Sequence, residues 1–179
     1  VKHITTAEGG IIILKNKKFS KKLKLNKAFG VNRNHSERKK NLTYDVVSLG
    51  FNYRMNELSA TMGIEQLKKL PNFLKIRKKN FKSFEKKLES IKNIRLIKNL
   101  INYNESSNYC LSIVLLNNLR NKRDHIISNL KKNGIGTSIY YPRAIPEMKY
   151  YKMKYNLDKS VFQNASKISK YSISFPIGP

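Results

Sequence analysis

Two short stretches of the sequence combine residue types that can carry out chemistry. The first is KHITTAEGG, residues 2–10, in which Lys2 lies shortly before a tight, glycine-rich turn. Partial desolvation beside such a turn favours a neutral amine, which is the form that takes part in Schiff-base chemistry. Most lysines near a glycine turn are solvated and unreactive, so this stretch by itself favours an ordinary surface lysine.

The second stretch is LGFNYRMNELSA, residues 49–60, which places Asn52 and Arg54 where a loop leads into a helix. Amide and guanidinium donors beside a helix N-terminus suit an anion such as phosphate. A helix cap combined with a surface salt bridge explains the same residues more simply. Neither stretch alone therefore establishes a site.

The elements that must position these residues follow from the hydrophobic periodicity. In chain order, the first half predicts a buried strand at residues 10–14, then a surface helix at 17–30 ending at Gly30, and a loop at 31–45. Two long helices follow. The first ends at Pro71, and the second covers about 71–90. Asn52 or Asn56 can cap the first of the two long helices, and Pro71 can stand in the first turn of the next. The last helix carries one apolar seam, formed by Leu74, Phe81, Phe84, Leu88 and Ile91.

The second half alternates strands with helices, which predicts an α/β unit. Strands are expected at residues 94–100, 109–116, 135–142 (ended by Pro142) and 172–176, and helices at 120–134 (capped by Gly134) and 160–171. The change of pattern places a domain boundary near residue 90. The chain of 179 residues thus accommodates one medium domain, or one domain with part of another.

Composition excludes some classes of protein and leaves one alternative open. Hydrophobic residues make up 40% of the chain, with 8 Phe and 10 Tyr, so a core can form and disorder is not expected. The net charge of +26 suits either a nucleic-acid or anionic-membrane partner or a drift in composition towards lysine. The lysines are scattered along helix faces rather than clustered, which favours drift over a basic nucleic-acid-binding module.

Cysteine and histidine content argues against disulfides and metal sites. Cys110 is the one cysteine, which excludes an intramolecular disulfide and a cysteine-rich zinc site, and the histidines (His3, His35 and His125) stand far apart. No apolar run reaches the roughly 18 residues of a membrane span, and the start lacks the features of a secretory signal. We therefore expect a soluble, cytoplasmic protein without a metal.

Taken together and in this order, the motifs resemble the DegT/DnrJ/EryC1/StrS family of pyridoxal-phosphate sugar aminotransferases. The segments that carry the resemblance are KHITTAEGGIIIL, YDVVSLGFNYRMNELSATMGIEQLKKL, IRKKNF, NGIGTSIYYP and ASKISKYSISFPIGP. The first two are highly specific in combination and the later ones are looser. The resemblance covers the whole chain and implies an aminotransferase of fold type I, with residues 1–90 ending the large cofactor domain and 91–179 forming a small α/β domain.

The resemblance also implies roles for particular residues. Lys2 matches the lysine that forms a Schiff base with pyridoxal 5'-phosphate and moves the proton during transamination. Family members that are dehydratases carry histidine there, so Lys2 favours an aminotransferase. Asn52 matches an asparagine that reaches the cofactor phosphate of the other subunit, which implies a homodimer with shared active sites. Arg54, in the same block, is expected to serve structure or the interface.

The implied substrates are a keto sugar linked to a nucleotide and an amino-acid donor, with glutamate expected, for polysaccharide or glycan synthesis. Tyr140, Tyr141 and Arg143 are candidates for the sugar-nucleotide side, although ordinary packing at a strand end explains them equally well. Cys110 stands where many members have histidine, and no histidine follows the YYP segment, so substrate contacts made by those histidines are in doubt.

Family members carry the lysine near mid-chain, so the residues that bind the pyridine ring should precede it. The chain is therefore expected to be a fragment, inactive alone. A non-catalytic regulator of the same family remains the other alternative.

Overall fold

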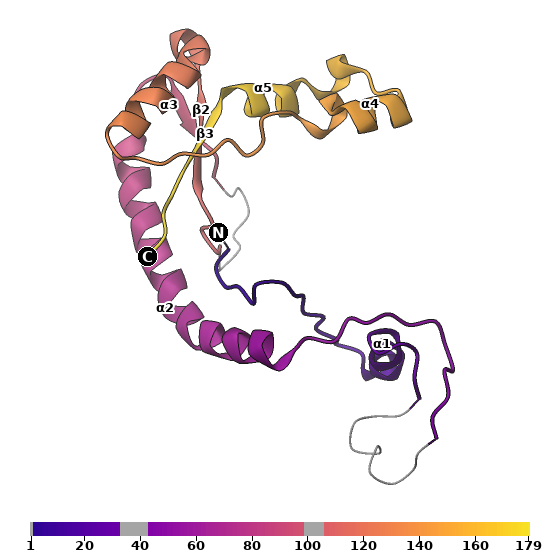
Figure 1. Cartoon of the computed structure of the whole chain (residues 1–179). Coiled ribbons are helices and arrows are strands. Elements are labelled where there is room, and N and C mark those ends of the chain that lie inside the picture. The colour runs from indigo at the N-terminus through magenta and orange to yellow at the C-terminus, as the bar shows by residue number, and fades with distance from the viewer. Residues whose placement is uncertain (1, 33–42, 99–105) are drawn as a thin grey trace. The chain divides into compact units, whose positions relative to one another are not determined.

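The computed structural model describes residues 2–32, 43–98 and 106–179 (Figure 1). It divides into two compact units. The N-terminal unit is Ile4–Lys68, and the C-terminal unit comprises Val1–His3 together with Lys69–Pro179. The expected domain boundary near residue 90 stays a prediction. His35, most of the expected loop at 31–45 and the end of the expected strand at 94–100 lie outside the described residues.

In the N-terminal unit, the expected short helix is confirmed and the expected strand is wrong. A 3-10 helix, Lys17–Phe19, leads into α1, Ser20–Asn26, and the chain reverses at Gly30, whose amide donates to the Leu25 carbonyl at 2.9 Å. Residues 10–14 form no strand, and Ile13 is 89% exposed. No strand among the described residues pairs with this run. A single strand without a neighbour leaves its backbone N–H and C=O groups without hydrogen-bond partners, so it is not stable.

The longest element is α2, Glu57–Leu88, one continuous helix. Asn56 caps it by accepting a hydrogen bond from the Ser59 amide at 2.8 Å, which confirms one of the two expected caps. The predicted break at Pro71 is wrong, because Pro71 lies inside the helix. A proline costs about 3 kcal/mol in a helix interior. Packing of Phe81 and Leu88 against the core of the C-terminal unit offsets that cost.

The C-terminal unit is built on an antiparallel sheet of three strands in the order β1-β2-β3. These are β1, Ile94–Leu96, β2, Leu111–Leu115, and β3, Ser172–Phe175. Alternate side chains of β2 point into the core, and Ile113 is the partner of Ile173 on β3. The fully buried members of the core cluster are Leu111, Ile113, Leu115, Ile173 and Ile177.

Helices α3, Arg123–Lys132, and α5, Gln163–Tyr171, confirm the two helices expected in this half. Each follows a 3-10 helix (Asn117–Lys122 and Lys159–Phe162), and a third 3-10 helix, Ile145–Glu147, precedes α4, Lys149–Tyr155, which the sequence did not predict. The strand expected at 135–142 is wrong. Only Ser138 pairs there, with Ser174 of β3, because Gly134, Gly136 and Pro142 limit the ladder.

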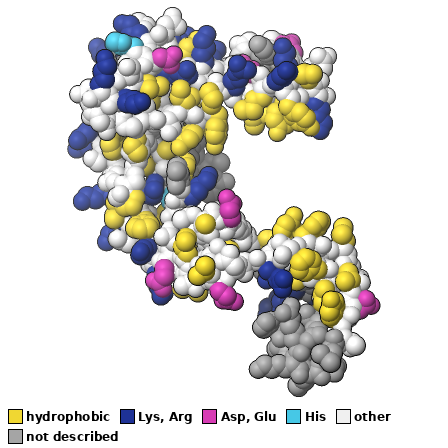
Figure 2. Space-filling view, in the orientation of Figure 1, with side chains coloured by type: hydrophobic (Ala, Val, Ile, Leu, Met, Phe, Trp, Pro, Cys, Tyr) yellow, Lys and Arg dark blue, Asp and Glu magenta, His cyan; other side chains and the backbone are white. Residues whose placement is uncertain are grey.

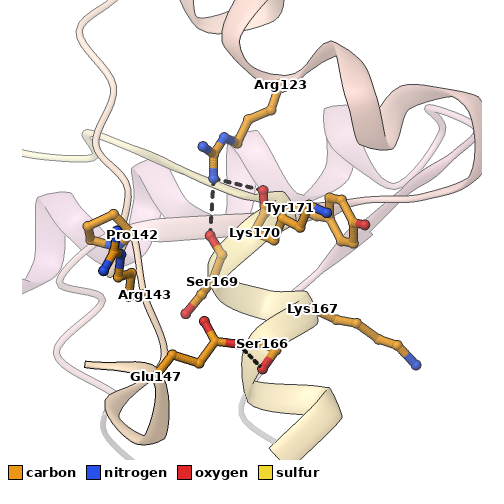
Figure 3. Close-up of a pocket in the computed structure, with 9 residues that line it drawn as sticks. All are labelled: Arg123, Pro142, Arg143, Glu147, Ser166, Lys167, Ser169, Lys170 and Tyr171. Carbon is orange, nitrogen blue, oxygen red and sulfur yellow. Dashed lines mark hydrogen bonds between the residues drawn. The ribbon is translucent and has the colours of Figure 1, made fainter. Parts of the chain in front are cut away.

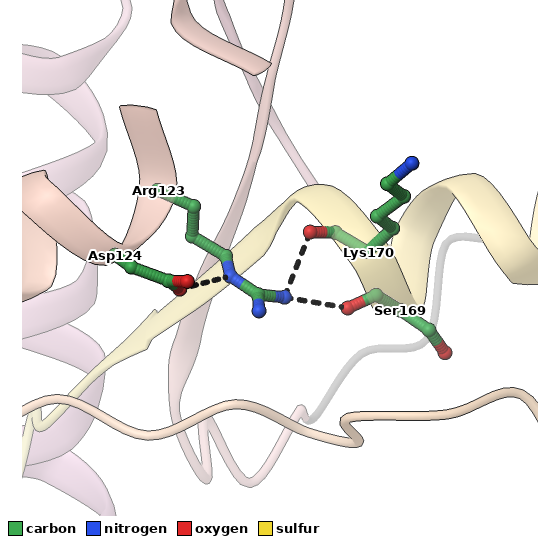
Figure 4. A network of polar contacts seen from close by, with 4 residues as sticks. All are labelled: Arg123, Asp124, Ser169 and Lys170. Atoms are coloured by element: carbon green, nitrogen blue, oxygen red, sulfur yellow. Dashed lines mark hydrogen bonds and ion pairs between the residues drawn. The ribbon is translucent and has the colours of Figure 1, made fainter. Parts of the chain in front are cut away.

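One arginine ties α3 to the end of α5 (Figure 4). The Arg123 guanidinium donates through one nitrogen to the carbonyl oxygens of Ser169 and Lys170, at 3.1 and 2.7 Å, and through Nε to Asp124 at 3.1 Å. These carbonyls belong to the last turn of α5, which lacks intrahelical donors for them. Arg123 therefore caps α5 from another helix, and its side chain is 20% exposed while that of Asp124 is 86% exposed.

Replacing Arg123 with methionine should destabilise the intact protein. Both charge-assisted bonds to the α5 carbonyls disappear, so the free energy of unfolding should fall by about 1.5–3 kcal/mol in urea denaturation. The control is Asp124→Asn, which removes only an exposed ion pair and should change the same free energy by less than about 0.5 kcal/mol. Equal effects of the two substitutions would contradict the capping role.

Candidate functional site

Lys2 lies against an aromatic side chain of the C-terminal unit. The residue is exposed, and its Nζ lies 5.4 Å from the centroid of the Tyr109 ring. The next residue, His3, tilts its ring towards Tyr109 with the centroids 5.5 Å apart. His3 Nε2 also hydrogen-bonds the carbonyl oxygen of Ser107 at 2.9 Å. The segment that carries Lys2 is thus attached to the residues just before β2.

Two further tyrosines extend this cluster. The Tyr109 and Tyr140 rings lie with their centroids 6.0 Å apart, and the Tyr140 and Tyr141 rings 5.5 Å apart. A hydrogen bond with the Tyr140 side chain, together with partial burial, raises the pKa of Tyr109 above its ordinary value. The structure brings together Lys2, Tyr140 and Tyr141, three of the residues expected from sequence.

The backbone of Tyr109 is anchored to the core. Its carbonyl oxygen accepts a hydrogen bond from an Arg77 guanidinium nitrogen on α2 at 3.2 Å. Leu111, two residues further along, is 1% exposed and begins β2. Because packed cores hold side chains in single rotamers, residues at this end of β2 have little freedom to move.

Arg143 lies elsewhere in the same unit, at a pocket of about 350 Å³ (Figure 3). The lining residues are Arg123, Pro142, Arg143, Glu147, Ser166, Lys167, Ser169, Lys170 and Tyr171. Glu147 accepts a hydrogen bond from the Ser166 hydroxyl at 2.6 Å. The lining includes four basic residues and one carboxylate, so its formal charge is positive, and none of the tyrosines around Lys2 lines it.

Asn52 lies in the N-terminal unit, in a loop that the chain after α1 holds in place. The neighbouring amides of Phe51 and Tyr53 donate to the carbonyls of Asn26 and Lys27 at 2.7 and 2.9 Å, and Asn52 itself forms a bridge with Ala28. The Asn52 side chain is exposed and accepts from Arg54 Nε at 3.4 Å.

Arg54 also lies over the Phe29 ring, at 5.3 Å from its centroid. Arg54 therefore contacts residues of its own unit, as a structural residue does. The residue that caps α2 is Asn56 and not Asn52. The Asn52 amide nitrogen is thereby left available for a ligand or partner of the exposed loop.

Tyr109 is the residue of this region that sequence reasoning missed. Cys110 stands where many family members have histidine, whereas the side chain beside Lys2 is that of its neighbour, Tyr109. The signal that could have found Tyr109 is its position at the start of a strand, after a run of polar residues. Cys110 itself contacts Ser112, with 3.6 Å between Sγ and the hydroxyl oxygen.

Comparison of the fold identifies the class of protein. The structure resembles PseC of Helicobacter pylori, an aminotransferase involved in the biosynthesis of pseudoaminic acid, with a TM-score of 0.84 and 25% identity over 99% of this chain and 46% of that one. It also resembles a Streptococcus pneumoniae protein described as a sugar aminotransferase, in its PLP form, with a TM-score of 0.80 and 20% identity over 100% of this chain and 45% of that one. The expected fold is confirmed as that of PLP-dependent aminotransferases of fold type I.

The chain belongs to the DegT/DnrJ/EryC1/StrS aminotransferase family, whose sequence model matches residues 1–179. It is 31% identical over 176 residues to a UDP-4-amino-4,6-dideoxy-N-acetyl-beta-L-altrosamine transaminase of Campylobacter jejuni, covering 98% of this chain and 44% of that protein. It is also 31% identical over 143 residues to a GDP-4-keto-6-deoxy-D-mannose 3-dehydratase of Escherichia coli, covering 74% of this chain and 36% of that protein. The chain thus spans less than half the length of these relatives.

Two glycines set the loop that carries Asn52, and Gly30 is the more constrained. Its φ is +71°, and a Cβ there would lie 1.7 Å from the Ser48 carbonyl oxygen. Gly30→Ala should therefore lower the thermal midpoint of the intact protein and cost more than the roughly 1 kcal/mol of an unfavourable φ alone. Gly134→Ala is the control, because Gly134 has φ +76° but open space around it. If both variants lose the same stability, close packing at Gly30 is not the constraint.

Proposed function

We propose that the intact protein is a pyridoxal-phosphate-dependent aminotransferase that transfers an amino group to a keto sugar linked to a nucleotide. Family membership supports this class of reaction. The observation that carries the proposal is Lys2, an exposed lysine held beside Tyr109 within the segment that matches the family's cofactor lysine. The reaction, its substrates and its partners are proposed for the whole protein, of which this chain forms one part.

The residues of the chain fit the cofactor. A primary amine is the group that bonds to the aldehyde of pyridoxal phosphate, and among the described residues no carboxylate forms an ion pair with Lys2. The exposed amide of Asn52 can donate to a phosphate oxygen of the cofactor bound by a partner subunit. When bound, the cofactor supplies an electron sink for the carbon that gives up or receives the amino group.

Lys2 would perform two tasks in this site. Its Nζ would hold the cofactor, and the same amine, when free, would move the proton between the two carbons that exchange it. One flexible side chain can do both because the amine stays attached at the same point of the backbone. Tyr109, Tyr140 and Tyr141 form the aromatic surface of the C-terminal unit on that side.

The family also includes dehydratases, so the type of reaction requires its own argument. The Escherichia coli relative is named as a dehydratase and is also 31% identical to this chain, but its match covers 74% of the chain against 98% for the Campylobacter jejuni transaminase. Lys2 favours transamination because an amine that holds the cofactor covalently can be exchanged for that of an amino substrate. His3 follows Lys2 but is engaged by Ser107 and Tyr109.

The proposed substrates are a nucleotide-linked keto sugar and an amino-acid donor such as glutamate, with the product used for polysaccharide or glycan synthesis. Tyr140, Tyr141 and Arg143 are proposed for the sugar-nucleotide side, since a tyrosine surface and an electropositive pocket suit a sugar and a phosphate group. No helix among the described residues is long and apolar enough to cross a membrane. Cys110 is a free thiol, which accords with the proposed cytoplasmic location.

We also propose a homodimer that shares its active sites. The N-terminal unit exposes many large apolar side chains, and Figure 2 shows such side chains at the surface. The most exposed of them are Ile11, Ile12, Ile13, Leu49, Tyr53 and Leu58. Exposed apolar surface on this scale is expected to be covered in the intact protein, by its remaining part or by a second copy, and Leu49 and Tyr53 lie close to Asn52 in the sequence. A second copy seated on this surface would bring its own lysine site to Asn52.

Lys2→Ala should abolish transamination in the intact protein while leaving the fold unchanged. Loss of the group that holds the cofactor and moves the proton should lower kcat by at least about 10²–10⁴-fold. Lys15→Ala, an exposed lysine in the other unit, is the control and should keep full activity. Borohydride reduction followed by peptide mass mapping should place the cofactor on Lys2. An active Lys2→Ala variant would refute the assignment, and a wild-type protein without activity would favour a non-catalytic family member.

Sharing of the site can be tested by mixing two inactive variants. Lys2→Ala and Asn52→Ala should each be inactive alone as homodimers. After the subunits are exchanged, a heterodimer has one intact site if Lys2 and Asn52 act across the interface, so activity should return to about a quarter of the wild-type value. No recovery despite exchange, shown by native mass spectrometry, would mean that both residues act within one subunit. An active Asn52→Ala homodimer would mean that Asn52 has no role.

A further inference from the structure

We propose that Tyr109 is a positioning residue for Lys2, which uses the face of its ring to hold the lysine amine in place. This inference rests on the proposed function, in which Lys2 is the reactive lysine. Tyr109 would act through Lys2 and would not itself exchange a proton with the substrate. The contacts that support it all lie within the C-terminal unit.

The geometry of the pair is that of an amine above an aromatic face. Lys2 Nζ lies 5.4 Å from the Tyr109 centroid, within the distance at which a ring attracts an ammonium group. A lysine side chain has four rotatable bonds and loses much rotamer freedom when its end is fixed. Contact with an aromatic face restricts the amine to one region before the substrate binds. Less side-chain entropy is then lost when the reaction begins.

The Tyr109 ring can position another group because it is itself held from several directions. The Tyr140 ring lies beside it, with the centroids 6.0 Å apart, and the Tyr140 side chain hydrogen-bonds the Tyr109 hydroxyl. His3 packs on the ring and hydrogen-bonds Ser107, which fixes the backbone next to Lys2 against the residues before β2. Arg77 holds the Tyr109 carbonyl. These contacts join four separate parts of the sequence, and all of them restrict the separation of Lys2 and Tyr109.

Simple packing would explain Tyr109 less well. A residue retained for the core would bury its side chain, whereas Tyr109 is only half-buried and is not a member of the core cluster. Its ring contacts both Lys2 and Tyr140, which are polar or amphipathic side chains and not core residues. The arrangement holds an exposed lysine in place, and such a contact adds little to the free energy of folding.

The contact itself can be measured without catalysis. In the cofactor-free intact protein, reductive methylation with ¹³C-formaldehyde labels the lysine amines, and the Lys2 signal is the one missing from Lys2→Ala. Ring-current shielding should displace this signal upfield in the wild type and in Tyr109→Phe, and Tyr109→Leu should abolish the displacement. An undisplaced Lys2 signal in the wild type, or one that Tyr109→Leu leaves unchanged, would overturn the proposal.

Kinetics of the same variants separate positioning from substrate binding. Tyr109→Leu should lower kcat by about 10–100-fold, the range that follows from misplacing a reacting group, with little change in KM for either substrate. Tyr109→Phe keeps the ring and should lose only about threefold, the effect of one weak hydrogen bond. Tyr155→Leu is the matched control, because Lys154 lies 5.3 Å from the Tyr155 ring away from the site, and it should not alter kcat.

The support given by Tyr140 provides a pH readout. The hydrogen bond raises the pKa of Tyr109, so Tyr140→Phe should lower this pKa. The Tyr109 phenolate should then form at a lower pH, which ¹³C NMR of Cζ-labelled tyrosine can measure. Since the raised pKa favours the folded protein below the ordinary tyrosine pKa, this support is lost as pH rises through the folded value. If the Tyr109 titration is the same in Tyr140→Phe as in the wild type, Tyr140 does not hold the Tyr109 hydroxyl, and this result would count against the proposal.

The outcomes also distinguish failure of this proposal from failure of the proposed function. If Lys2→Ala is inactive but Tyr109→Leu keeps the wild-type kcat, the function stands and the positioning role is wrong. A rise in KM with unchanged kcat would make Tyr109 a substrate contact instead, which also overturns the proposal. If Lys2→Ala is active, Lys2 is not the reactive lysine and the positioning role falls with it.

Discussion

Burial of β2 is the constraint on which the C-terminal unit depends. Leu111 and Leu115 are each 1% exposed, and β2 pairs with β1 on one side and β3 on the other. A strand held on both edges and packed on one face cannot slip by one residue without turning its apolar side chains to water. The residues directly before β2 are therefore held in a fixed position. Tyr109, two residues before Leu111, inherits this rigidity.

The same constraint explains why a residue near the start of the chain can belong to this unit. Lys2 and His3 have no secondary structure of their own, yet His3 reaches the segment just before β2 through Ser107 and Tyr109. Lys2 and His3 are far in sequence from Ser107 and Tyr109, so contacts between neighbouring residues alone could not place them there. A site that draws on residues far apart in sequence gains its precision from the strand, and the flexible lysine needs to supply only the amine.

Sequence patterns predicted the elements whose apolar residues face a core, and failed where a tertiary contact decides. The alternation in β2 and the apolar face of α3 predicted both elements, because Ile113, Leu115 and Ile127 pack into one cluster. Pro71 predicted a break that packing of α2 overcomes, and the run of isoleucines at 11–13 predicted a strand that finds no partner among the described residues.

Of the candidate site, Lys2, Asn52 and Tyr140 were predicted because a familiar motif or an aromatic run marks them. Its place at the start of a strand could mark Tyr109 as a candidate, but its contacts come from residues 3, 77 and 140, and no local pattern reports that they meet. The helix α4 was missed for a related reason. Its sequence, KYYKMKY, has no apolar periodicity that distinguishes a helix from a loop.

The large positive charge and the proposed chemistry are separate properties of the molecule. Among the described residues the ion pairs are few, and those of Lys68, Lys98 and Arg123 are all with carboxylates on exposed or half-exposed surface. The net charge of +26 already subtracts the 11 acidic residues from the 37 basic ones, so no ion pair within the chain reduces it. A field of this kind raises the encounter rate with an anionic nucleotide sugar but is screened within about 8 Å at physiological salt. It cannot select a substrate at Lys2, so selectivity must come from contacts of short range, such as those of the tyrosines beside it.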